Sequence, residues 1–397
     1  MKNDNLIIGL DIGSSKIRTV ICEINSVGEI NLRKMGSSVS TGITKGLIND
    51  PNQLSKAIER SISRANCNLS SKPSSIITNI PLHKTKSIQN MGFVLSKEQS
   101  GQISEYEKIE CIRRSKNIIK SPDQRVLHVV PLFFKIDGNQ IHNPIGAFGN
   151  NLEVQTHIIL GNTENISNLN YAIKELQFHI CGIVYDILAN AQVSLTEDER
   201  KKGAILIDMG SRFTKVGIFY NNLLYNSFVI PIAGETITSD IAYCLKASIP
   251  EAERIKILHG KNNETAEVAD KFIISTKDNT RQEIEKKFLC RIIDARIQEL
   301  FNIIKEKIDL PNKADYQVVL TGGTAALSST EKICGSIFNH PIRTGLPESI
   351  KSSIPNQEYS SAIGLVIYGL KTGAIAFPPP KKKSFLHKMF NKLIKIF

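Results

Sequence analysis

The sequence of 397 residues lacks several features that would assign it at once to a class of protein. Its seven cysteines are scattered, with no CxxC pair and no even framework, so reduced thiols in a cytoplasm fit best. It contains no run of about 18 apolar residues, and we therefore expect no membrane-spanning segment. The opening MKNDNLIIGLDIG has charge inside its apolar segment and no small-residue cleavage site, which argues against a signal peptide.

The excess of positive charge is concentrated at one end of the chain. The formal net charge is +12, and six lysines among the last 17 residues supply half of it, which leaves +6 for the other 380 residues. Nothing in that remainder resembles a basic stripe interleaved with aromatics, so we expect no nucleic-acid partner. The hydrophobic content of 41% and charged content of 22% are typical of a globular chain, here long enough for two or three domains.

The C-terminal segment PPPKKKSFLHKMFNKLIKIF is both apolar and basic. Placed on a helix, one half of residues 385–397 is apolar: Phe385, Leu386, Met389, Phe390, Leu393, Ile394, Ile396 and Phe397. The lysines are Lys381, Lys382, Lys383, Lys388, Lys392 and Lys395, preceded by a stiff triple-proline spacer. At about 20 Å, such a helix is shorter than the roughly 30 Å membrane core. We expect it to lie flat on an anionic membrane surface; the alternative is docking on the protein's own surface.

The rest of the chain contains an internal repeat. LDIGSSKIRTVI at 10–21 returns as IDMGSRFTKVGI at 207–218, which aligns Asp11 with Asp208 and Gly13 with Gly210. Each copy reads as an apolar strand, a tight turn carrying Asp-x-Gly-Ser, and a second strand. A further strand-like run follows each copy, at 30–40 and 223–234. Such duplication suggests two related halves facing each other.

The periodicity of the remaining segments predicts strands mixed with helices. We expect further strands at IIGLDI, SIITNI, VLHVVPLFFKI, VQTHIIL, AILIDM and QVVLTGG. Helices are expected around 52–66, 105–119, 167–178, 235–248 and 281–307. Strands followed by helices indicate an α/β fold.

A strand that ends in Asp-x-Gly-Ser suits phosphate binding. Glycine lets backbone N–H groups approach, serine can donate, and the aspartate can hold a metal or its water shell. A single such turn could equally be an ordinary hairpin. Two copies in register, followed by VVLTGGTAAL at 318–327, favour a nucleotide site. There a strand ends on Gly322 and Gly323, and a helix is expected to start, leaving room for a flat nucleoside.

These residues carry a resemblance to a known family. The segments GLDIGSSK, VLHVVP, LTEDER, IDMG, IPIAGETITSDIAY, EAERIK, LTGGTAAL and EYSSAIGLVIYG follow one another in this order and are closed by the basic tail. Together they resemble the FtsA family of bacterial cell-division proteins, within the actin, Hsp70 and sugar-kinase superfamily. The resemblance implies an α/β, actin-like (ribonuclease H-like) fold of two lobes with a duplicated core. It also implies a small α+β subdomain inserted in lobe 1 and a C-terminal amphipathic helix.

The resemblance also implies boundaries within the chain. The lobe 1 core would comprise 1–81 and 162–202, with 82–161 as the inserted subdomain and 347–372 as the closing helix region. The lobe 2 core would comprise 203–237 and 301–346, with 238–300 as its small subdomain. A linker at 373–384 would lead to the membrane-targeting helix at 385–397.

By the same resemblance, ATP would bind in a cleft between the lobes. The first phosphate loop would be Asp11, Gly13, Ser14, Ser15 and Lys16, and the second Asp208, Gly210, Ser211 and Arg212. Glu253 and Lys256 would flank the ribose and adenine, and Gly322 and Gly323 would bound the adenosine pocket. Asp11 and Asp208 would hold Mg²⁺ through its bound water. Asn190 lies where a water-positioning side chain is found in such folds, although an ordinary helix residue near a hinge is an equal interpretation.

The second phosphate loop departs from the family pattern, which usually reads Asp-x-Gly-Gly-Gly-Thr. Here Ser211, Arg212 and Phe213 follow Gly210, which restricts the approach of phosphate to the backbone and removes a hydroxyl. Arg212 would either compensate as a phosphate ligand or block the site. We expect ATP binding with slow or absent hydrolysis; the alternative is a cleft without nucleotide.

The family resemblance implies an adaptor that tethers FtsZ filaments to the cytoplasmic face of the inner membrane at the division septum. It would self-assemble like actin and recruit other division proteins. The FtsZ C-terminal tail would bind the lobe 2 small subdomain, where Lys287, Arg291 and Arg296 are spaced as a basic stripe. A self-paired, solvated helix face is the alternative, because three acids lie close by. The other functions we consider are a membrane-associated small-molecule kinase and a pilus-assembly protein of the same fold.

Overall fold

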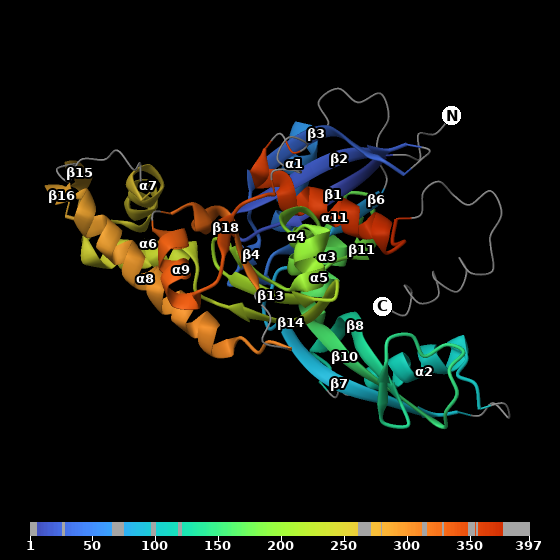
Figure 1. Cartoon of the computed structure of the whole chain (residues 1–397). Helices are drawn as coiled ribbons and strands as arrows, with labels where there is room; N and C mark the ends of the chain where they lie inside the picture. The colour runs from blue at the N-terminus through green and yellow to red at the C-terminus, as the bar shows by residue number, and fades with distance from the viewer. Residues whose placement is uncertain are drawn as a thin grey trace. The chain divides into compact units, whose positions relative to one another are not determined.

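The structure is a computed structural model of the chain. It describes residues 6–25, 28–65, 75–96, 101–117, 121–260, 271–278, 280–311, 316–327, 329–347, 354 and 356–375. The chain divides into two compact units (Figure 1). Unit 1 comprises Met1–Val193, Asn222–Phe228 and Ile354–Phe397, and unit 2 comprises Ser194–Asn221 and Val229–Ser353.

Unit 1 is built on a five-stranded sheet with the order β11-β6-β1-β2-β3. Its strands are β1 (Leu6–Ile12), β2 (Lys16–Ile24), β3 (Ile30–Val39), β6 (Ser75–Thr78) and β11 (His179–Ile183). β1 pairs antiparallel with β2 and parallel with β6. After its first residue β1 is buried throughout, as expected of a central strand covered on both faces.

Helices cover both faces of this sheet. They are α1 (Pro51–Ala65), α3 (Thr163–Lys174), α4 (Asp186–Ser194) and α11 (Ser360–Lys371). The short 3₁₀ helix η2 (Gln357–Tyr359) precedes α11, and a small hairpin of β4 (Ile43–Thr44) and β5 (Leu47–Ile48) precedes α1. α11 approaches β1 at Gly9, where an added Cβ would lie 2.3 Å from the carbonyl oxygen of Ala362. The opposite face carries α1, since Thr19 Oγ1 lies 2.7 Å from Ser61 Oγ. Small residues therefore set the close packing on each face.

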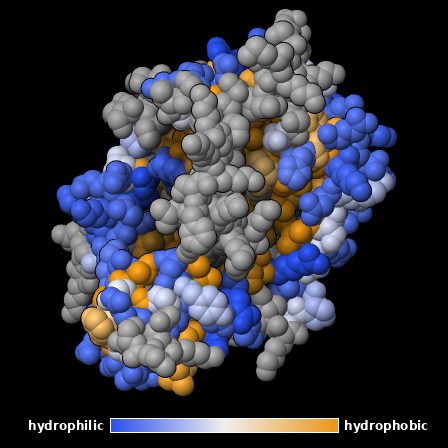
Figure 2. Space-filling view, turned by 90° about the vertical axis from the view of Figure 1, so that its right-hand side faces the viewer, coloured by the Kyte–Doolittle hydropathy of each residue, from blue (hydrophilic) through white to orange (hydrophobic). Residues whose placement is uncertain are grey.

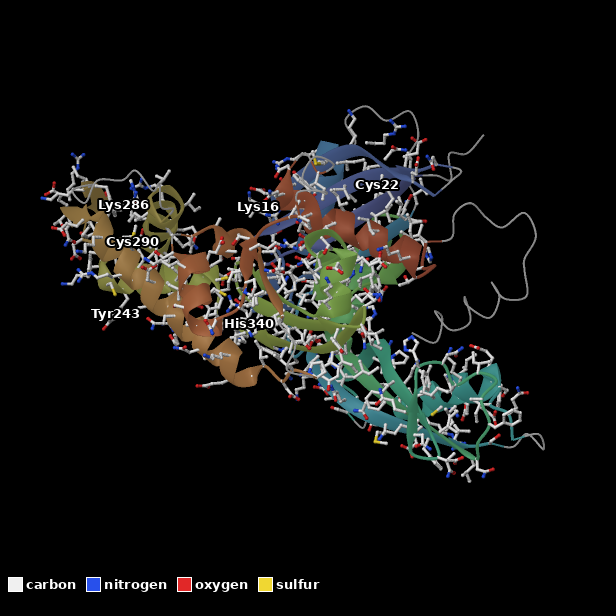
Figure 3. The ribbon with its side chains drawn as sticks, viewed as in Figure 1. Lys16, Cys22, Tyr243, Lys286, Cys290 and His340 are labelled. Atoms are coloured by element: carbon white, nitrogen blue, oxygen red, sulfur yellow. The ribbon has the colours of Figure 1, made fainter. Side chains whose placement is uncertain are left out.

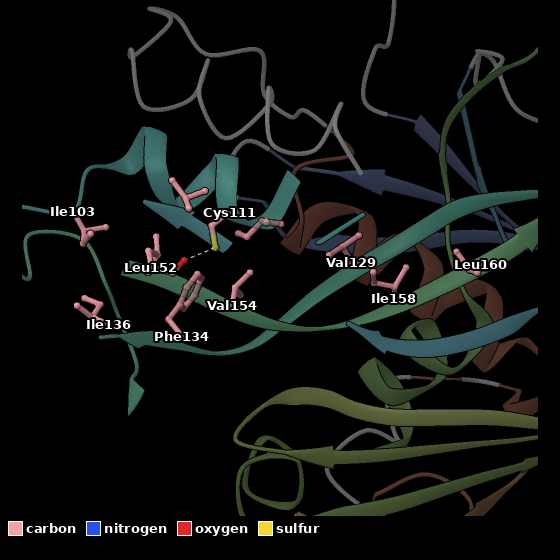
Figure 4. Close-up of a cluster of buried hydrophobic side chains, with 11 residues drawn as sticks. Ile103, Cys111, Val129, Phe134, Ile136, Leu152, Val154, Ile158 and Leu160 are labelled. Carbon is pink, nitrogen blue, oxygen red and sulfur yellow. Dashed lines mark hydrogen bonds between the residues drawn. The ribbon is translucent and has the colours of Figure 1, made fainter. Parts of the chain in front are cut away.

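A second sheet of unit 1, ordered β7-β10-β8-β9, lies between β6 and α3 in the chain. Its elements are β7 (Lys86–Leu95), α2 (Glu105–Ser115), β8 (Gln124–Ile136), β9 (Asn139–Ile141) and β10 (Asn151–Asn162). α2 begins with a capping box between Ser104 and Glu107 and packs its buried Cys111 toward the sheet. The cluster in Figure 4 includes Phe134, Leu152 and Val154, and the Cys111 thiol donates to the Leu152 carbonyl at 3.3 Å. The segment thus has a hydrophobic core of its own.

A second five-stranded sheet repeats the plan with the order β14-β13-β12-β17-β18, and its strands other than β14 belong to unit 2. The strands of this sheet are β12 (Ala204–Met209), β13 (Thr214–Tyr220), β14 (Leu223–Ile230), β17 (Gln317–Thr321) and β18 (Ile342–Thr344). The helices of unit 2 are α5 (Glu197–Lys202), α6 (Gly234–Cys244), α7 (Ile249–His259), α8 (Lys286–Lys307) and α9 (Thr330–Phe338). The short η1 (Gly323–Ala326) follows β17, and the hairpin of β15 (Lys271–Ser275) and β16 (Arg281–Glu285) precedes α8. β12 pairs antiparallel with β13 and parallel with β17, as β1 does with β2 and β6. The duplication predicted from the sequence is present in the topology.

Two of the predicted elements are wrong in part. The helix expected over 281–307 begins only at Lys286, because Arg281–Glu285 pairs with Lys271–Ser275 as a strand. The helix expected directly after Gly323 begins at Thr330, and a single 3₁₀ turn fills the start of the gap. The predicted C-terminal amphipathic helix lies outside the described residues, and within the described ranges no helix is long and apolar enough to cross a membrane.

Candidate functional site

The first candidate loop is the turn between β1 and β2, residues Gly13 to Lys16, called turn 1 below. The Gly13 N–H donates to the Lys16 carbonyl at 3.1 Å, which closes the hairpin. A Cβ at Gly13 would lie 2.8 Å from that same oxygen, so the tight turn requires glycine. Ser15 and Lys16 are exposed at the tip and Ser14 is half-buried. Turn 1 therefore presents two hydroxyls and an ammonium group to solvent.

Asp11, at the end of β1, is braced from the neighbouring strand. Asn79 directly follows β6, and its Nδ2 donates to Asp11 Oδ1 at 2.9 Å while its Oδ1 accepts from the Ile12 N–H at 2.7 Å. Arg18 lies opposite Asp11 in the β1–β2 register, with Nη1 at 3.8 Å from Asp11 Oδ2. The buried carboxylate is thus held by an amide and faces a cation.

The second candidate loop, turn 2, joins β12 to β13 over residues Gly210 to Phe213. The Gly210 N–H donates to the Phe213 carbonyl at 3.1 Å, the same bond and the same length as in turn 1. The Gly210 carbonyl in turn accepts from Thr324 Oγ1 at 2.7 Å and from the Gly234 N–H at 3.2 Å. Turn 2 is therefore tied to the segment after β17 and to the start of α6.

Asp208 occupies the place in unit 2 that Asp11 has in unit 1. It lies opposite Lys215 in the β12–β13 register, and Lys215 Nζ approaches Asp208 Oδ2 to 2.6 Å. Both side chains are largely buried. In each copy the aspartate therefore pairs with the basic residue seven positions later, a regularity that the aligned segments contain and that our sequence analysis missed.

Arg212, the residue that departs most from the family pattern, points to an acid in its own unit. Arg212 Nη1 lies 2.5 Å from Glu235 Oε2, and Ser211 Oγ donates to Glu235 Oε1 at 3.2 Å. Glu235 is the second residue of α6. One carboxylate thus holds both polar side chains of turn 2.

Gly322 and Gly323 differ sharply in their surroundings. Gly322 has φ +90°, and a Cβ there would lie 2.4 Å from the Met209 carbonyl oxygen and 2.6 Å from Asp208 Oδ1. Gly322 therefore packs directly behind turn 2, and only glycine fits. A Cβ at Gly323 would meet no atom within 4 Å. The open space beside Gly323 is consistent with the expected approach of a flat ligand to bare backbone.

Lys256 and Glu253, on successive turns of α7, are joined to α6. The buried Lys256 Nζ donates to Glu253 Oε2 at 2.7 Å, to Thr238 Oγ1 at 2.8 Å and to the Gly234 carbonyl at 2.9 Å. An ammonium group has three N–H donors, so these contacts use all of them. Lys256 consequently positions Glu253, which is 44% exposed and keeps Oε1 for a ligand. Lys256 therefore has a supporting role in this geometry, and its expected place beside the nucleoside stays a prediction.

Asn190, the candidate for positioning water, is buried within α4. α11 crosses α4 next to it, since a Cβ at Gly364 would lie 2.2 Å from the Ala189 carbonyl oxygen. At the start of α4, His128 Nε2 accepts from the Tyr185 N–H at 2.9 Å, and burial lowers the pKa of His128 to about 4, so the ring is neutral. α4 is therefore firmly held, which fits either interpretation of Asn190.

The two aspartates do not by themselves make a metal centre. Within the described ranges, no group of three or more His, Cys, Asp or Glu side chains could hold a metal ion. Asp11 and Asp208 are each next to a cation, which disfavours direct coordination. Their buried carboxylates are better suited to the expected indirect role, in which each accepts a hydrogen bond from a water bound to Mg²⁺ while phosphate oxygens supply other ligands of the ion.

The three basic residues proposed for peptide binding all lie on α8 but have different partners. Arg296 donates to both carboxylate oxygens of Asp240, at 2.6 and 2.9 Å, and is also paired with Glu299. Lys287 and Arg291 are exposed, and the Arg291 guanidinium lies 5.4 Å from the centroid of the Phe288 ring. Arg296 thus joins α8 to α6, whereas Lys287 and Arg291 face solvent.

Exposed apolar side chains occur in unit 2 and on the inserted sheet. On α6, Tyr243 is 86% exposed, and Figure 3 shows it at the same end of unit 2 as Lys286 and Cys290 of α8. In the inserted sheet, Met91, Phe93 and Leu95 alternate along the edge strand β7 and are about half exposed. Figure 2 shows hydrophobic residues scattered among hydrophilic ones on the face that it presents. These exposed apolar groups are candidates for contacts with other chains.

Every candidate membrane-binding residue lies outside the described residues. These are Lys381, Lys382, Lys383, Phe385, Leu386, Lys388, Met389, Phe390, Lys392, Leu393, Ile394, Lys395, Ile396 and Phe397. Their amphipathic arrangement therefore stays a prediction from the sequence.

Comparisons with known proteins agree with the family resemblance. The family model "Cell division protein FtsA" matches residues 205–364, and "SHS2 domain inserted in FTSA" matches residues 83–160. The chain is 33% identical to the cell division protein FtsA of Borreliella burgdorferi, over 98% of this chain and 96% of that one. It is 28% identical to that of Escherichia coli K12, over 92% of this chain and 90% of that one.

Solved structures show the actin-like fold. A "PilM-PilN type IV pilus biogenesis complex" covers 92% of this chain and 98% of the matched chain with a TM-score of 0.64 at 14% identity. MreB5 of Spiroplasma citri bound to ADP covers 94% and 98% with a TM-score of 0.55 at 13% identity. At such identities these likenesses concern the fold alone. The two-lobed fold class predicted from the sequence is confirmed, and the near full-length match to its relatives places the chain in the FtsA family of bacterial cell-division proteins.

Proposed function

We propose that the chain is an ATP-binding adaptor that tethers FtsZ filaments to the cytoplasmic face of the inner membrane at the division septum. The observation that carries this proposal is the match to an FtsA relative over 98% of the chain, which includes the inserted SHS2 domain. As an adaptor, it would bind an FtsZ tail and a membrane with separate parts of the chain. A small-molecule kinase would need a carboxylate base and a substrate pocket, and we identify neither among the residues that the structure describes. A pilus-assembly role has only the shared fold in its favour.

Two turns with matching hydrogen bonds support ATP as the ligand. Turn 1 presents the hydroxyls of Ser14 and Ser15 as donors to phosphate, and turn 2 presents that of Ser211, which donates to Glu235 in the free protein. Glu253 Oε1 and the space beside Gly323 suit the nucleoside. A protein with a similar fold, MreB5 of Spiroplasma citri, has been solved with ADP bound.

The first test is equilibrium dialysis of the whole chain with ATP and magnesium. We expect micromolar binding, and no binding at millimolar ATP would refute this part of the proposal. Gly323→Ala is the sharpest variant, because its methyl group would occupy the proposed nucleoside position and meets no protein atom within 4 Å. It should weaken ATP binding at least tenfold while leaving the melting temperature unchanged.

Slow or absent hydrolysis follows from the side chains of turn 2. Ser211 and Arg212 are held by Glu235, and Phe213 lacks the hydroxyl usual at that position. The proposal predicts phosphate release from ATP at less than about one per minute, far below the typical 1 to 100 per second of kinases. Steady turnover in that kinase range would contradict it and would revive the kinase alternative.

An exposed basic and aromatic surface on α8 is the proposed site for the FtsZ tail. Lys287, Phe288 and Arg291 would contact a peptide bearing carboxylates, while Arg296 serves to hold α8 on α6. Arg291→Glu should lower the affinity for an FtsZ C-terminal peptide about tenfold, measured by fluorescence anisotropy. Lys332→Glu reverses the charge of an exposed lysine on α9 and is the matched control. Equal affinities for the two variants would exclude this surface.

Residues 381–397 are the proposed membrane anchor. Phe390→Glu places a charge in the apolar half of the expected helix, whereas Asn391→Glu places the same charge in its polar half. In flotation with anionic vesicles, the first variant should leave the membrane and the second should remain largely bound. If both variants still bind the vesicles, the interfacial helix is contradicted. Self-assembly would raise membrane affinity further, because linked tails rebind at high effective concentration.

A further inference from the structure

The carboxylate of Glu235 occupies the donors that a phosphate would use in turn 2. Arg212 Nη1 lies 2.5 Å from one of its oxygens, and Ser211 Oγ lies 3.2 Å from the other. The Glu235 N–H also donates to the Ser211 carbonyl at 2.6 Å, so the backbone fixes the acid beside the turn. A guanidinium and a hydroxyl that converge on one anionic group form the arrangement that proteins use to bind phosphate.

Turn 1 has a carboxylate in the corresponding role. Glu358 Oε2 lies 3.5 Å from Lys16 Nζ and 3.7 Å from Arg18 Nη2. Lys16 and Arg18 are two residues apart on β2, so their side chains emerge on the same face. Glu358 lies in η2, just before α11. In both units, therefore, an acid close to a helix start forms an ion pair with a cation in or next to the phosphate turn, at a longer distance in turn 1 than in turn 2.

These acids are accessible and can be displaced. Glu235 is 44% and Glu358 is 53% exposed, so each can rotate into water at little desolvation cost. An incoming phosphate carries more charge than a carboxylate and would gain the released donors. If the acid stays in place instead, it repels the phosphate. In both cases the acid lowers the affinity for phosphate and has no direct effect on the nucleoside.

We propose that Glu235 is an internal counter-ion of turn 2 and Glu358 one of turn 1, and that a phosphate group must displace each acid to bind at that acid's own turn. The inference rests on the proposed binding of ATP and adds that these acids set its strength. The affinity for a nucleotide then depends on its number of phosphates, because the acids weaken the binding of the phosphate groups and do not affect the binding of the nucleoside. It also resolves the alternatives for Arg212: its guanidinium is a phosphate ligand that Glu235 holds in reserve.

An ordinary structural role of the acids makes a different prediction. A glutamate in the first turn of a helix stabilises the helix through its dipole. If Glu235 did only this, Glu235→Gln would lower the melting temperature and leave the affinity for ATP unchanged. The counter-ion role predicts tighter ATP binding even if the free protein becomes slightly less stable.

The test uses the full chain with Glu235→Gln, Glu358→Gln and the double variant. Dissociation constants are measured for ATP, adenosine and inorganic tripolyphosphate. The control variants Glu23→Gln and Glu283→Gln remove one acid from an exposed ion pair in each unit, with Arg33 and Lys271 respectively. We expect each test variant to bind ATP and tripolyphosphate about two- to tenfold more tightly, with adenosine unchanged and the controls equal to the wild type.

The outcomes separate this inference from the proposed ATP binding. ATP binding that is equal in the wild type, the variants and the controls overturns the counter-ion role alone. The counter-ion role is also overturned if the variants bind adenosine and ATP more tightly by the same factor. ATP binding that is undetectable in the wild type and appears in the double variant supports the counter-ion role. No binding of ATP, adenosine or tripolyphosphate by any variant overturns both.

Discussion

The two turns share their hydrogen bonds and differ in what stands behind them. In each, a glycine N–H closes the hairpin at 3.1 Å, and an aspartate faces a basic residue across the strands. Turn 1 is braced by the side chain of Asn79, which follows β6. Turn 2 is braced by the backbone at Gly322, which follows β17. The comparison teaches that the duplicated backbone geometry is retained, whereas the residue that supports it has been replaced.

The largest expected effect comes from filling the space behind turn 2. Gly322→Ala would bring a methyl group within 2.6 Å of both Met209 O and Asp208 Oδ1, at a φ of +90° that disfavours alanine. We expect a loss of about 4 kcal/mol in the free energy of unfolding, measured by urea denaturation. Gly323→Ala is the matched control and should change this free energy by less than about 0.5 kcal/mol. Similar losses in both variants would show that the backbone support is not specific to Gly322.

The aspartates should differ in importance for stability. Asp208→Ala removes the acid 2.6 Å from the largely buried Lys215, so we expect a loss of about 3 kcal/mol. Asp11→Ala should lose about 1 kcal/mol, because Arg18 is 3.8 Å away and is also close to Glu358. Hydrogen exchange of β1 and β12 reports each unit separately. The reverse order of the two losses would disprove the contrast between the turns.

The brace of turn 1 can be removed without adding bulk. Asn79→Ala takes away the donor to Asp11 and the acceptor for the Ile12 N–H, and both of these groups are buried. We predict a loss of about 2 kcal/mol, seen as faster hydrogen exchange at the end of β1. The exposed Asn139→Ala in β9 is a control for the same substitution. An unaltered exchange rate at Ile12 would mean that turn 1 holds itself together.

A buried histidine in unit 1 should make the free energy of unfolding depend on pH in mild acid. His157 of unit 1 is fully buried, its Nε2 lies 3.0 Å from Ser227 Oγ, and burial lowers its pKa from 6.5 to about 4. The unfolded chain takes up the proton below pH 6.5 and the folded chain only near pH 4, so the free energy of unfolding falls across this window. From pH 7 to pH 5 the loss is about 2 kcal/mol for this group.

His157→Gln should remove this part of the pH dependence, as followed by urea denaturation at several pH values. His142→Gln, at an exposed site, is the control and should retain it. A slope that is unchanged in His157→Gln would show that other groups cause the acid sensitivity.

The sequence predicted the repeated parts of the fold well and the contacts between distant segments poorly. Apolar runs such as AILIDM gave strands with accurate bounds, because a buried central strand needs uninterrupted hydrophobic residues. The strand at Arg281–Glu285 was missed, since its charged residues also fit the helical pattern that continues into α8. Only its pairing with Lys271–Ser275 distinguishes the two, and that pairing depends on the folded chain.

The candidate site shows the same division. The glycines and aspartates of both turns could be identified from the motif, since their roles follow from local geometry. The attachment of Arg212 to Glu235 could not, because the two are 23 residues apart and meet only through the fold. The occupied donors of Lys256 were likewise invisible in the sequence. The aspartate and cation seven residues apart could have been found by extending the comparison of the two copies.

The close packing of α11 on β1 has a consequence for synthesis. Unit 1 contains both the first described strand of the chain and the last described helix, and Gly9 in β1 lies against Ala362 in α11. Unit 2 lies between them in the chain and can fold while β1 still lacks its cover. A ribosome must therefore have passed residue 371 before the apolar face of β1 is shielded, which leaves the nascent chain open to aggregation or chaperone binding until that point.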